Sequence, residues 1–370
     1  MVREIGDNCR VGRPRILLGT ALVVAALSAA TTALIADRAQ SFADVAVGRS
    51  APPYVVEGGS SIVVVWSTST HHKIALLRAP LDWSYQTHFG EDAVAGSADG
   101  KVFVAAFTED SIRKTALFSF SLTSEGRVTG FRQIPHGVIP GLGQVSIAVS
   151  PDGTWAAVSG TPQTRAAGVP RGQARIFLIN TRTGQLKVWQ GGLARPGFEL
   201  TFPSMSWGSA RSLYVLAQWC RRQVFPQGNV ACNAYHAQPV SEVRVIDLSG
   251  LGGSLRAAKP VISNSPQYPL ILQAVATDSG KAITALVRNG RQVSVVRIDA
   301  KTGDVDAVLY QHVAPDFNGQ AGPLTASLAV DGTGQYVLVN EDGNDRAGWI
   351  HHGRYHDLHA RYGNGSGVAW

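Results

Sequence analysis

A short hairpin pattern recurs five times along the chain and restricts the fold more than any other feature. The clearest copy, VSPDGTWAAVSG at 149–160, reads as an apolar strand, a tight turn and a second apolar strand. The other copies lie at 94–107, 203–218, 272–287 and 326–339. Each places Asp-Gly or a substitute between two short strands, where residues that tolerate left-handed dihedrals make a tight turn favourable. The pattern therefore predicts a repeat architecture built from β-hairpins.

A second hairpin follows each copy of the first. At 176–190 and 293–310 a Thr-Gly pair supplies the positive dihedral of a bulged turn. The other second hairpins are expected at 116–132, 243–258 and 348–359. Each unit of about 50 to 70 residues thus holds four antiparallel strands, the size and content of one β-propeller blade. Helical periodicity is not sustained outside the N-terminal segment, so we expect an all-β fold.

The two ends of this repeat region predict how many blades it has. YVVEGG at 54–59 and the stretch at 60–79 read as the second, third and fourth strands of a blade without a first strand. GVAW at 367–370 matches SMSW at 204–207, which is a first strand. Pairing of the last strand with the first blade removes the open sheet edges that an incomplete blade exposes. We therefore expect a six-bladed β-propeller closed by the C-terminal strand.

The turn and third-strand motifs also resemble a known class of repeat. SPDG at 150–153, followed by a third strand that ends in Thr-Gly, is similar to the TolB-like and WD40-like (PD40-type) propeller repeats of exported bacterial proteins. The resemblance covers about residues 53–370. It implies binding of a protein or ligand at a face of the ring. Propellers of this type include scaffolds, sensors, lactonases and peptidase lids, so the motif specifies architecture and says little about chemistry.

The N-terminal region predicts a membrane segment. Residues 16–36, ILLGTALVVAALSAATTALIA, carry no charge, and a run of that length can cross a bilayer. The arginines of 1–15 favour a cytoplasmic location for that segment, which places the chain after it outside the cytoplasm. We interpret 16–36 as a single-pass anchor in the cell membrane, 37–52 as a linker and 53–370 as the propeller. The alternative is a cleaved signal peptide and a secreted protein.

Composition and charge narrow the classes of partner. The 40 Gly and 18 Pro are spread among short apolar runs, which is typical of strands and turns. The net charge is +7, and no basic run interleaved with aromatic residues follows residue 15. Nucleic-acid binding is therefore not expected.

The candidate binding site is the long predicted loop at 218–241, within the fourth blade. Long loops on a rigid scaffold often carry function, and Arg and aromatic side chains are enriched at binding hot spots. The candidate binding residues are Trp219, Arg221, Arg222, Phe225, Tyr235 and His236. Outside the cytoplasm Cys220 and Cys232 are expected to form a disulfide that stiffens the loop, with two buried free thiols as the alternative. A tolerated insertion explains the same loop without any binding role.

Motifs for catalysis are not found in the sequence. It contains neither a Gly-x-Ser-x-Gly elbow nor a His-Glu-x-x-His pair, so no catalytic residue, metal ligand or cofactor is assigned. His71 and His72 are expected in a turn of the first blade, and His351 and His352 in the corresponding turn of the sixth. A zinc or copper site needs three or four ligands around one ion, and turns on the outer rim of adjacent blades diverge. We interpret these histidines as exposed turn residues.

Two functions of different classes follow from these observations. The preferred one is a membrane-anchored or secreted, non-enzymatic scaffold that binds a protein or cell-envelope ligand through the face that carries the 218–241 loop. A variant of it is a structural cap on a neighbouring enzyme or envelope assembly. The alternative is a hydrolase or lactonase that works in the central channel, which predicts carboxylates or histidines converging there around a divalent ion.

Overall fold

The computed structural model describes the repeat region of the chain. The described residues are 51–59, 62–78, 93–109, 114–140, 142–162, 174–224, 230–232, 240–250, 252–314, 326–341, 346–358 and 367–370. The predicted segments 1–15 and 16–36, and the linker up to residue 50, lie outside them. Within the described ranges, no helix has both the length and the apolar character needed to cross a membrane.

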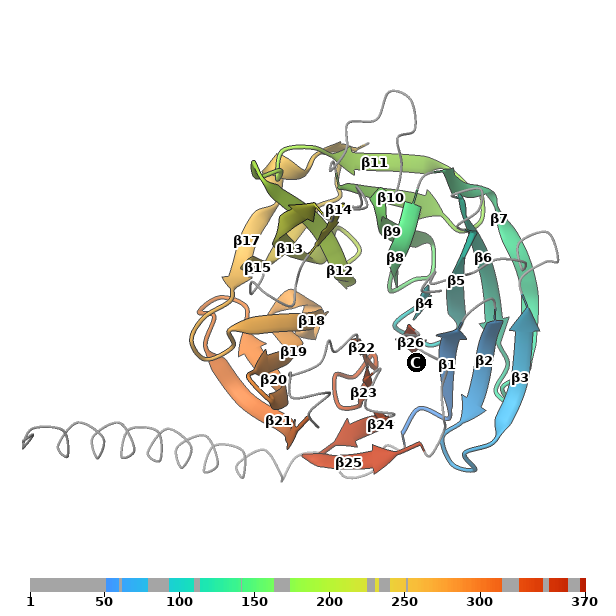
Figure 1. Ribbon diagram of the computed structural model, residues 1–370. Coiled ribbons are helices and arrows are strands. Elements are labelled where there is room, and N and C mark those ends of the chain that lie inside the picture. The colour runs from blue at the N-terminus through green and yellow to red at the C-terminus, as the bar shows by residue number, and fades with distance from the viewer. Residues whose placement is uncertain are drawn as a thin grey trace, which may run out of the picture. The chain divides into compact units, whose positions relative to one another are not determined.

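The described strands form six sheets around a common centre, so the predicted all-β, six-bladed propeller is confirmed (Figure 1). We number the blades in chain order and give their strands from the centre outward. Blade 1 comprises β26 (Val368–Ala369), β1 (Tyr54–Gly59), β2 (Ile62–Ser67) and β3 (Lys73–Arg78). Blade 2 comprises β4 (Ala93–Gly96), β5 (Val102–Glu109), β6 (Lys114–Leu122) and β7 (Val128–Pro140). Blade 3 comprises β8 (Leu142–Val149), β9 (Trp155–Pro162), β10 (Arg175–Asn180) and β11 (Leu186–Gln190).

The second half of the ring has the same plan. Blade 4 comprises β12 (Phe198–Ser209), β13 (Ser212–Val224), β15 (Val240–Asp247) and β17 (Lys259–Ser263), with β14 (Val230–Cys232) paired to β13. Blade 5 comprises β18 (Leu270–Thr277), β19 (Ala282–Asn289), β20 (Gln292–Asp299) and β21 (Val305–Val313). Blade 6 comprises β22 (Ala326–Val330), β23 (Val337–Glu341), β24 (Arg346–His351) and β25 (Arg354–Asp357). Helix in the described residues is limited to two 3-10 turns, η2 (Leu255–Ala257) and η3 (Asp278–Gly280).

The C-terminal strand β26 pairs antiparallel with β1. Val56 lies opposite Ala369, and Glu57 lies opposite Val368. The backbone N–H of Gly58 also donates to the carbonyl of Gly367 (2.9 Å). Figure 1 shows the C-terminus beside β26 at the inner side of the ring.

The turn between the first two strands of blade 3 explains the SPDG motif. The Oδ1 of Asp152 accepts hydrogen bonds from the hydroxyl of Ser150 (2.6 Å) and the N–H of Thr154 (3.0 Å). Gly153 has a φ of 70°, a conformation that L side chains rarely adopt. Blade 2 repeats this arrangement, since the hydroxyl of Ser97 donates to Asp99 (2.6 Å). Short-range side-chain chemistry therefore defines these turns, which is why the sequence motif predicts them.

The hydrophobic core is divided into six clusters, each of which lies between two neighbouring blades. The cluster between blades 3 and 4 includes Ile176 and Trp189 from one blade and Leu213 and Trp219 from the next. The cluster between blades 6 and 1 holds Val55, Leu338 and Trp370. Every blade thus buries both faces against its neighbours, and a single blade has no core of its own.

Blade 4 departs from the hairpin predicted at 243–258. Residues 253–254 form β16 instead, which pairs in parallel with β11 of blade 3. The fourth strand of blade 4 is β17, which begins only at Lys259. Leu255, between the two, is 1% exposed and belongs to the core cluster between blades 3 and 4. Burial of this leucine against the neighbouring blade therefore outweighs the local turn preference of the glycines before it.

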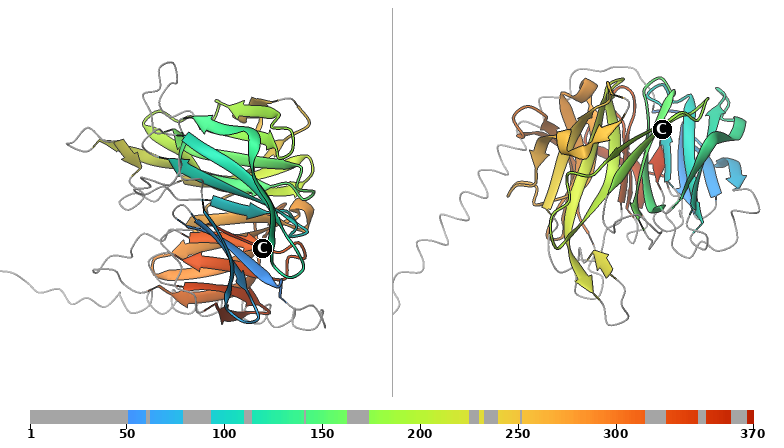
Figure 2. Two further views of the ribbon diagram at one scale, coloured as in Figure 1. Left: turned by 90° about the vertical axis from the view of Figure 1, so that its right-hand side faces the viewer. Right: turned by 90° about the horizontal axis from the view of Figure 1, so that it is seen from above.

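The two ends of each blade differ. We call the end with the connection between the first and second strands, residues 150–154 in blade 3, the turn end. The loop end is the opposite one, where β9 finishes at Pro162 and β10 begins at Arg175. At the loop end blade 4 is longer than blades 2, 3 and 5, because its second strand β13 has 13 residues whereas β5, β9 and β19 have eight each. Figure 2 shows the end of β13 and β14, in yellow-green, projecting beyond the other blades.

Candidate functional site

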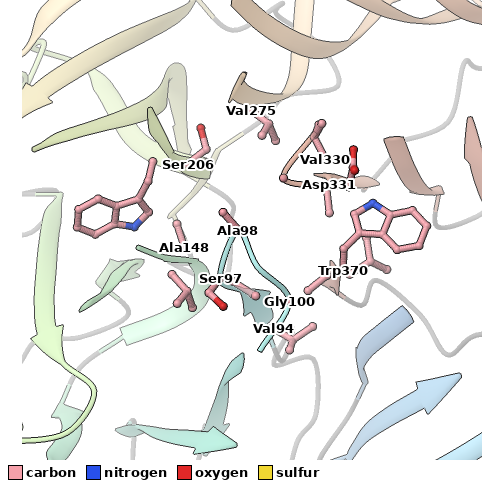
Figure 3. Close-up of a pocket in the computed structure, with 18 of the residues that line it drawn as sticks. Val94, Ser97, Ala98, Gly100, Ala148, Ser206, Val275, Val330, Asp331 and Trp370 are labelled. Carbon is pink, nitrogen blue, oxygen red and sulfur yellow. The ribbon is translucent and has the colours of Figure 1, made fainter. Parts of the chain in front are cut away.

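A cavity of about 1180 Å³ occupies the centre of the ring. Its wall is formed by the innermost strands β4, β8, β12, β18, β22 and β26, and by several turns at the turn end. Figure 3 shows Val94, Ala148, Val275 and Val330, from four of these strands, around the same space. Small and apolar side chains therefore make up most of the wall of this central channel.

The serines of the innermost strands hold neighbouring blades together. The hydroxyl of Ser146 donates to the carbonyl of Phe202 (2.7 Å). The hydroxyl of Ser206 accepts from the N–H of Ala276 (2.7 Å). Both bonds connect strands of different blades, and Ser206 is 7% exposed. These hydroxyls satisfy buried groups of the ring, and none of these contacts provides the general base that a serine nucleophile requires.

Four charged residues of the described chain line the channel, all of them at the turn end: Asp99, Lys101, Asp278 and Asp331. Lys101 forms an ion pair with Asp99 (3.3 Å), and Asp278 forms one with Arg297. The Oδ1 of Asp331 accepts from the N–H of Gln335 (2.9 Å) and of Tyr336 (2.8 Å). Each carboxylate is thus bound to its own turn or blade.

The hydrogen bonds within the turns also lower the pKa of the turn aspartates Asp152 and Asp99. The hydrogen bond from Ser150 is the main reason that the pKa of Asp152 is lowered, and partial burial opposes it. For Asp99, burial acts to raise the pKa, but the hydrogen bonds from Ser97 and from the N–H of Lys101 outweigh it and lower the pKa. A carboxylic acid that serves as a general acid near neutral pH needs a raised pKa instead. These two aspartates therefore fit a structural role in the turns.

Two tryptophans line the channel at matching positions, at the ends of SMSW and GVAW. The indole nitrogens of Trp207 and Trp370 are buried and have no hydrogen-bond partner among the described residues, and the same holds for the hydroxyl of Thr277. Figure 3 shows Trp370 at the wall of the channel, across from Ser206. Among the buried polar side-chain atoms of the described channel wall, these three have no partner in the ring.

His71, His72 and His352 lie in the connections between strands, as the sequence predicts, whereas His351 is the last residue of β24 and is only partly exposed. His71 and His352 adopt φ values of 58° and 47° there. The Nδ1 of His71 lies 3.2 Å from the carbonyl of Leu358 in blade 6, and the ring of His351 stacks on Tyr336 (4.2 Å between centroids). The pKa of His351 is lowered mainly by burial of its ring and also by charge repulsion from His352 and His356. Within the described ranges, no group of three or more His, Cys, Asp or Glu side chains is arranged to hold a metal ion.

The predicted blade 4 site is only partly described. Phe225, Tyr235 and His236 lie outside the described residues, and for Arg222 and Cys232 the backbone alone is described. Arg221 is exposed in β13. Arg222 lies opposite Cys232 in the pairing of β13 with β14, which places Cys232 diagonally across from Cys220. The region predicted as a loop from 218 onward thus begins as a continuation of the second strand.

Trp219, one of the candidate binding residues, is a core residue in the structure. Its side chain is 1% exposed, and its indole N–H donates to the carbonyl of Leu193 (2.8 Å). The guanidinium of Arg195 lies over the ring at 3.9 Å from its centroid. Arg195 also pairs with Glu242 (3.0 Å), which in turn pairs with Arg244 (2.6 Å). Sequence reasoning missed Arg195, because it lies 24 positions before Trp219 in a connection between blades.

Comparison with known proteins gives no family assignment. The chain matches no family model and no curated protein. Among solved structures, the periplasmic gluconolactonase PpgL of Pseudomonas aeruginosa is 12% identical, with a TM-score of 0.47 over 85% of this chain and 97% of that one. A putative 6-phosphogluconolactonase of Bacteroides fragilis is 11% identical (TM-score 0.45; 85% and 97% covered). The WD40 repeats of RRP9 are also 11% identical (TM-score 0.43; 85% and 90% covered). At these levels of similarity none of them bears on function.

Proposed function

We propose that the chain is a non-enzymatic β-propeller scaffold that binds a protein or cell-envelope ligand at the loop end of blade 4. The observation that carries this proposal is the extension of β12 and β13 beyond the neighbouring blades, with Arg221 exposed on it. A rigid, two-stranded extension presents side chains with little ordering cost on binding. Arginine is also among the residues enriched in binding hot spots.

The chemistry of the channel supports binding over catalysis. Ser146 and Ser206 of its wall are engaged in bonds between blades, and its carboxylates are engaged in turns and ion pairs. Hydrolysis needs a positioned nucleophile with a base, or a metal-bound water, and the described channel residues do not form either arrangement.

Export, anchoring and a disulfide are part of the same proposal. The uncharged segment 16–36 anchors the chain in the cell membrane, and the propeller lies outside the cytoplasm. The Cys220–Cys232 link is proposed on the pairing of β13 with β14, and an oxidising compartment permits it. We also propose that β26 closes the ring through its pairing with β1.

In-cell crosslinking of the tagged, full-length chain tests the proposal. The test variant replaces Arg221 and Arg222 by Ala, and the matched control replaces the exposed turn-end residues Arg182 and Arg211 by Ala. Each variant loses two arginines, the test variant both from blade 4 and the control one each from blades 3 and 4. A partner that is captured by the parent and the control, but lost in the test variant, supports a site at the loop end of blade 4. Equal capture by all three rejects that site.

The alternative function is a channel-centred enzyme of the hydrolase or lactonase type. The observation in its favour is the channel itself, because about 1180 Å³ is large enough for a small ligand and the unpaired donors of Trp207, Thr277 and Trp370 lie in its wall. Incubation of the purified chain with a panel of lactones, with and without added divalent ions, separates the two functions. Turnover that is lost when Thr277 is replaced by Val supports the enzyme, and absence of turnover supports the scaffold.

A further inference from the structure

The positive charge of the chain is concentrated in blades 3 and 4. Residues 153–241 contain nine basic residues and a single acidic one, Glu199, for a net charge of +8 against +7 for the whole chain. The rest of the chain is therefore close to neutral. A local excess of this size creates a positive potential that attracts anionic partners and speeds their encounter.

The extended strands of blade 4 present part of this charge on one face. Phe198 of β12 lies opposite Arg221 of β13, and Leu200 lies opposite Trp219. Side chains alternate along a strand, so all four share the face that packs on blade 3, as the burial of Leu200 and Trp219 in that core cluster shows. Phe198 and Arg221 continue this face past the core, where Phe198 is 37% exposed.

Arg195 completes the face from the connection between the two blades. It covers Trp219, and its side chain is 40% exposed. We call Arg195, Phe198 and Arg221, with Trp219 beneath them, the arginine face.

Acidic residues near the arginine face do not neutralise it. Glu242 is bonded to two guanidinium groups, those of Arg195 and Arg244, so this triad keeps one positive charge. Glu199 lies opposite Cys220 in the strand pairing and so belongs to the other side of the sheet from Arg221.

We propose that the arginine face is the docking surface for a carboxylate-rich peptide segment of a partner protein. This inference rests on the proposed scaffold function and assigns a class to its partner. Guanidinium groups bind carboxylates through paired, charge-assisted hydrogen bonds, and Arg195 is already oriented for this by its stacking on Trp219. The exposed ring of Phe198, opposite Arg221 in the strand pairing, provides an apolar contact, which favours a peptide with interspersed apolar side chains over a phosphate polymer or a lipid surface.

Binding of a model peptide to the full-length chain tests this assignment. The probe is a fluorescein-labelled peptide of repeated Glu-Glu-Leu units, compared with repeated Lys-Lys-Leu, inorganic polyphosphate and phosphatidylglycerol vesicles. We expect saturable binding of the acidic peptide that weakens steeply between about 0.05 M and about 0.5 M salt. Arg221→Glu should weaken it about tenfold or more, and Arg221→Lys, which keeps the charge but loses the planar fork, should weaken it less.

The control variant is Arg182→Glu, which makes the same charge change at an exposed turn-end position of blade 3. Equal weakening by Arg182→Glu and Arg221→Glu would mean that only net charge matters and would overturn the proposal. So would tighter binding of polyphosphate or of vesicles than of the peptide, or absence of saturable binding to the acidic peptide. If crosslinking still captures a partner through Arg221 and Arg222 while the acidic peptide fails to bind, the scaffold function stands and the carboxylate-rich partner is rejected. Thermal unfolding of each variant checks that it is folded.

Discussion

Replacement of Trp219 by Ala tests whether this residue belongs to the core or to a binding surface. The structure buries the ring almost completely, bonds its N–H to Leu193 and covers it with Arg195. Truncation of a buried tryptophan costs about 3 to 5 kcal/mol. Loss of the cation–π contact adds about 0.5 to 1 kcal/mol, and the unpaired carbonyl of Leu193 adds about 1 kcal/mol or more. We therefore expect the free energy of unfolding to fall by about 5 kcal/mol.

Urea denaturation followed by far-ultraviolet circular dichroism measures this change. Trp219→Phe keeps most of the apolar contact and loses the hydrogen bond, so it should cost about 1 to 2 kcal/mol. Arg221→Ala, two positions along the same strand and exposed, should change stability by less than about 0.5 kcal/mol. If Trp219→Ala destabilised the chain no more than Arg221→Ala, the indole would not be buried as described. Trp219 would then again be a candidate for a surface residue that contacts a partner.

Three further predictions test the turns, the inner ring and its closure. Asp152→Ala should destabilise the chain by about 1 kcal/mol at pH 7 through loss of the turn hydrogen bonds. Because the pKa of Asp152 is lowered in the folded chain, its stabilising effect is fully present above the unfolded pKa of about 4 and is lost as the pH falls below that value. The difference in unfolding free energy between parent and variant should therefore shrink in acid. A difference that does not change with pH would contradict this. Ser206→Ala leaves the buried N–H of Ala276 unpaired and should cost about 1 to 3 kcal/mol in chemical denaturation, whereas Ser209→Ala, at an exposed position of the same strand, should cost little. Deletion of residues 367–370 removes β26 and three buried side chains and should lower the midpoint of thermal unfolding by several degrees; an unchanged midpoint would argue against closure by this strand.

Local chemistry explains why the repeat was predictable. In the SPDG turn, the hydrogen bonds that Asp152 accepts from Ser150 and Thr154 lie within five residues of the chain. Alternation of apolar residues in the flanking strands is equally local. Counting these units along the chain predicted six blades, and the described sheets confirm that number.

The candidate site was predicted less well, because exposure depends on the neighbouring blade. In the sequence, Trp219 is followed by Cys220 and two arginines, and the whole stretch reads as part of a loop. In the structure its side of the strand faces blade 3 and is covered by Leu193 and Arg195, from the connection between blades. The same packing exposes Phe198 and Arg221, which lie two positions beyond Leu200 and Trp219 on their strands, as a pair across two strands.

The sequence by itself determined the class of fold, the number of blades, the chemistry of the turns and the uncharged N-terminal segment, because each depends on residues close together in the chain. Only the tertiary structure decided which side chains are buried between blades, where residues 253–254 pair, and how Arg195 comes to lie over Trp219. It also decided that the channel carboxylates are engaged in turns and ion pairs. The physical reason is that a blade has no core of its own, so burial is defined only when six blades are packed side by side.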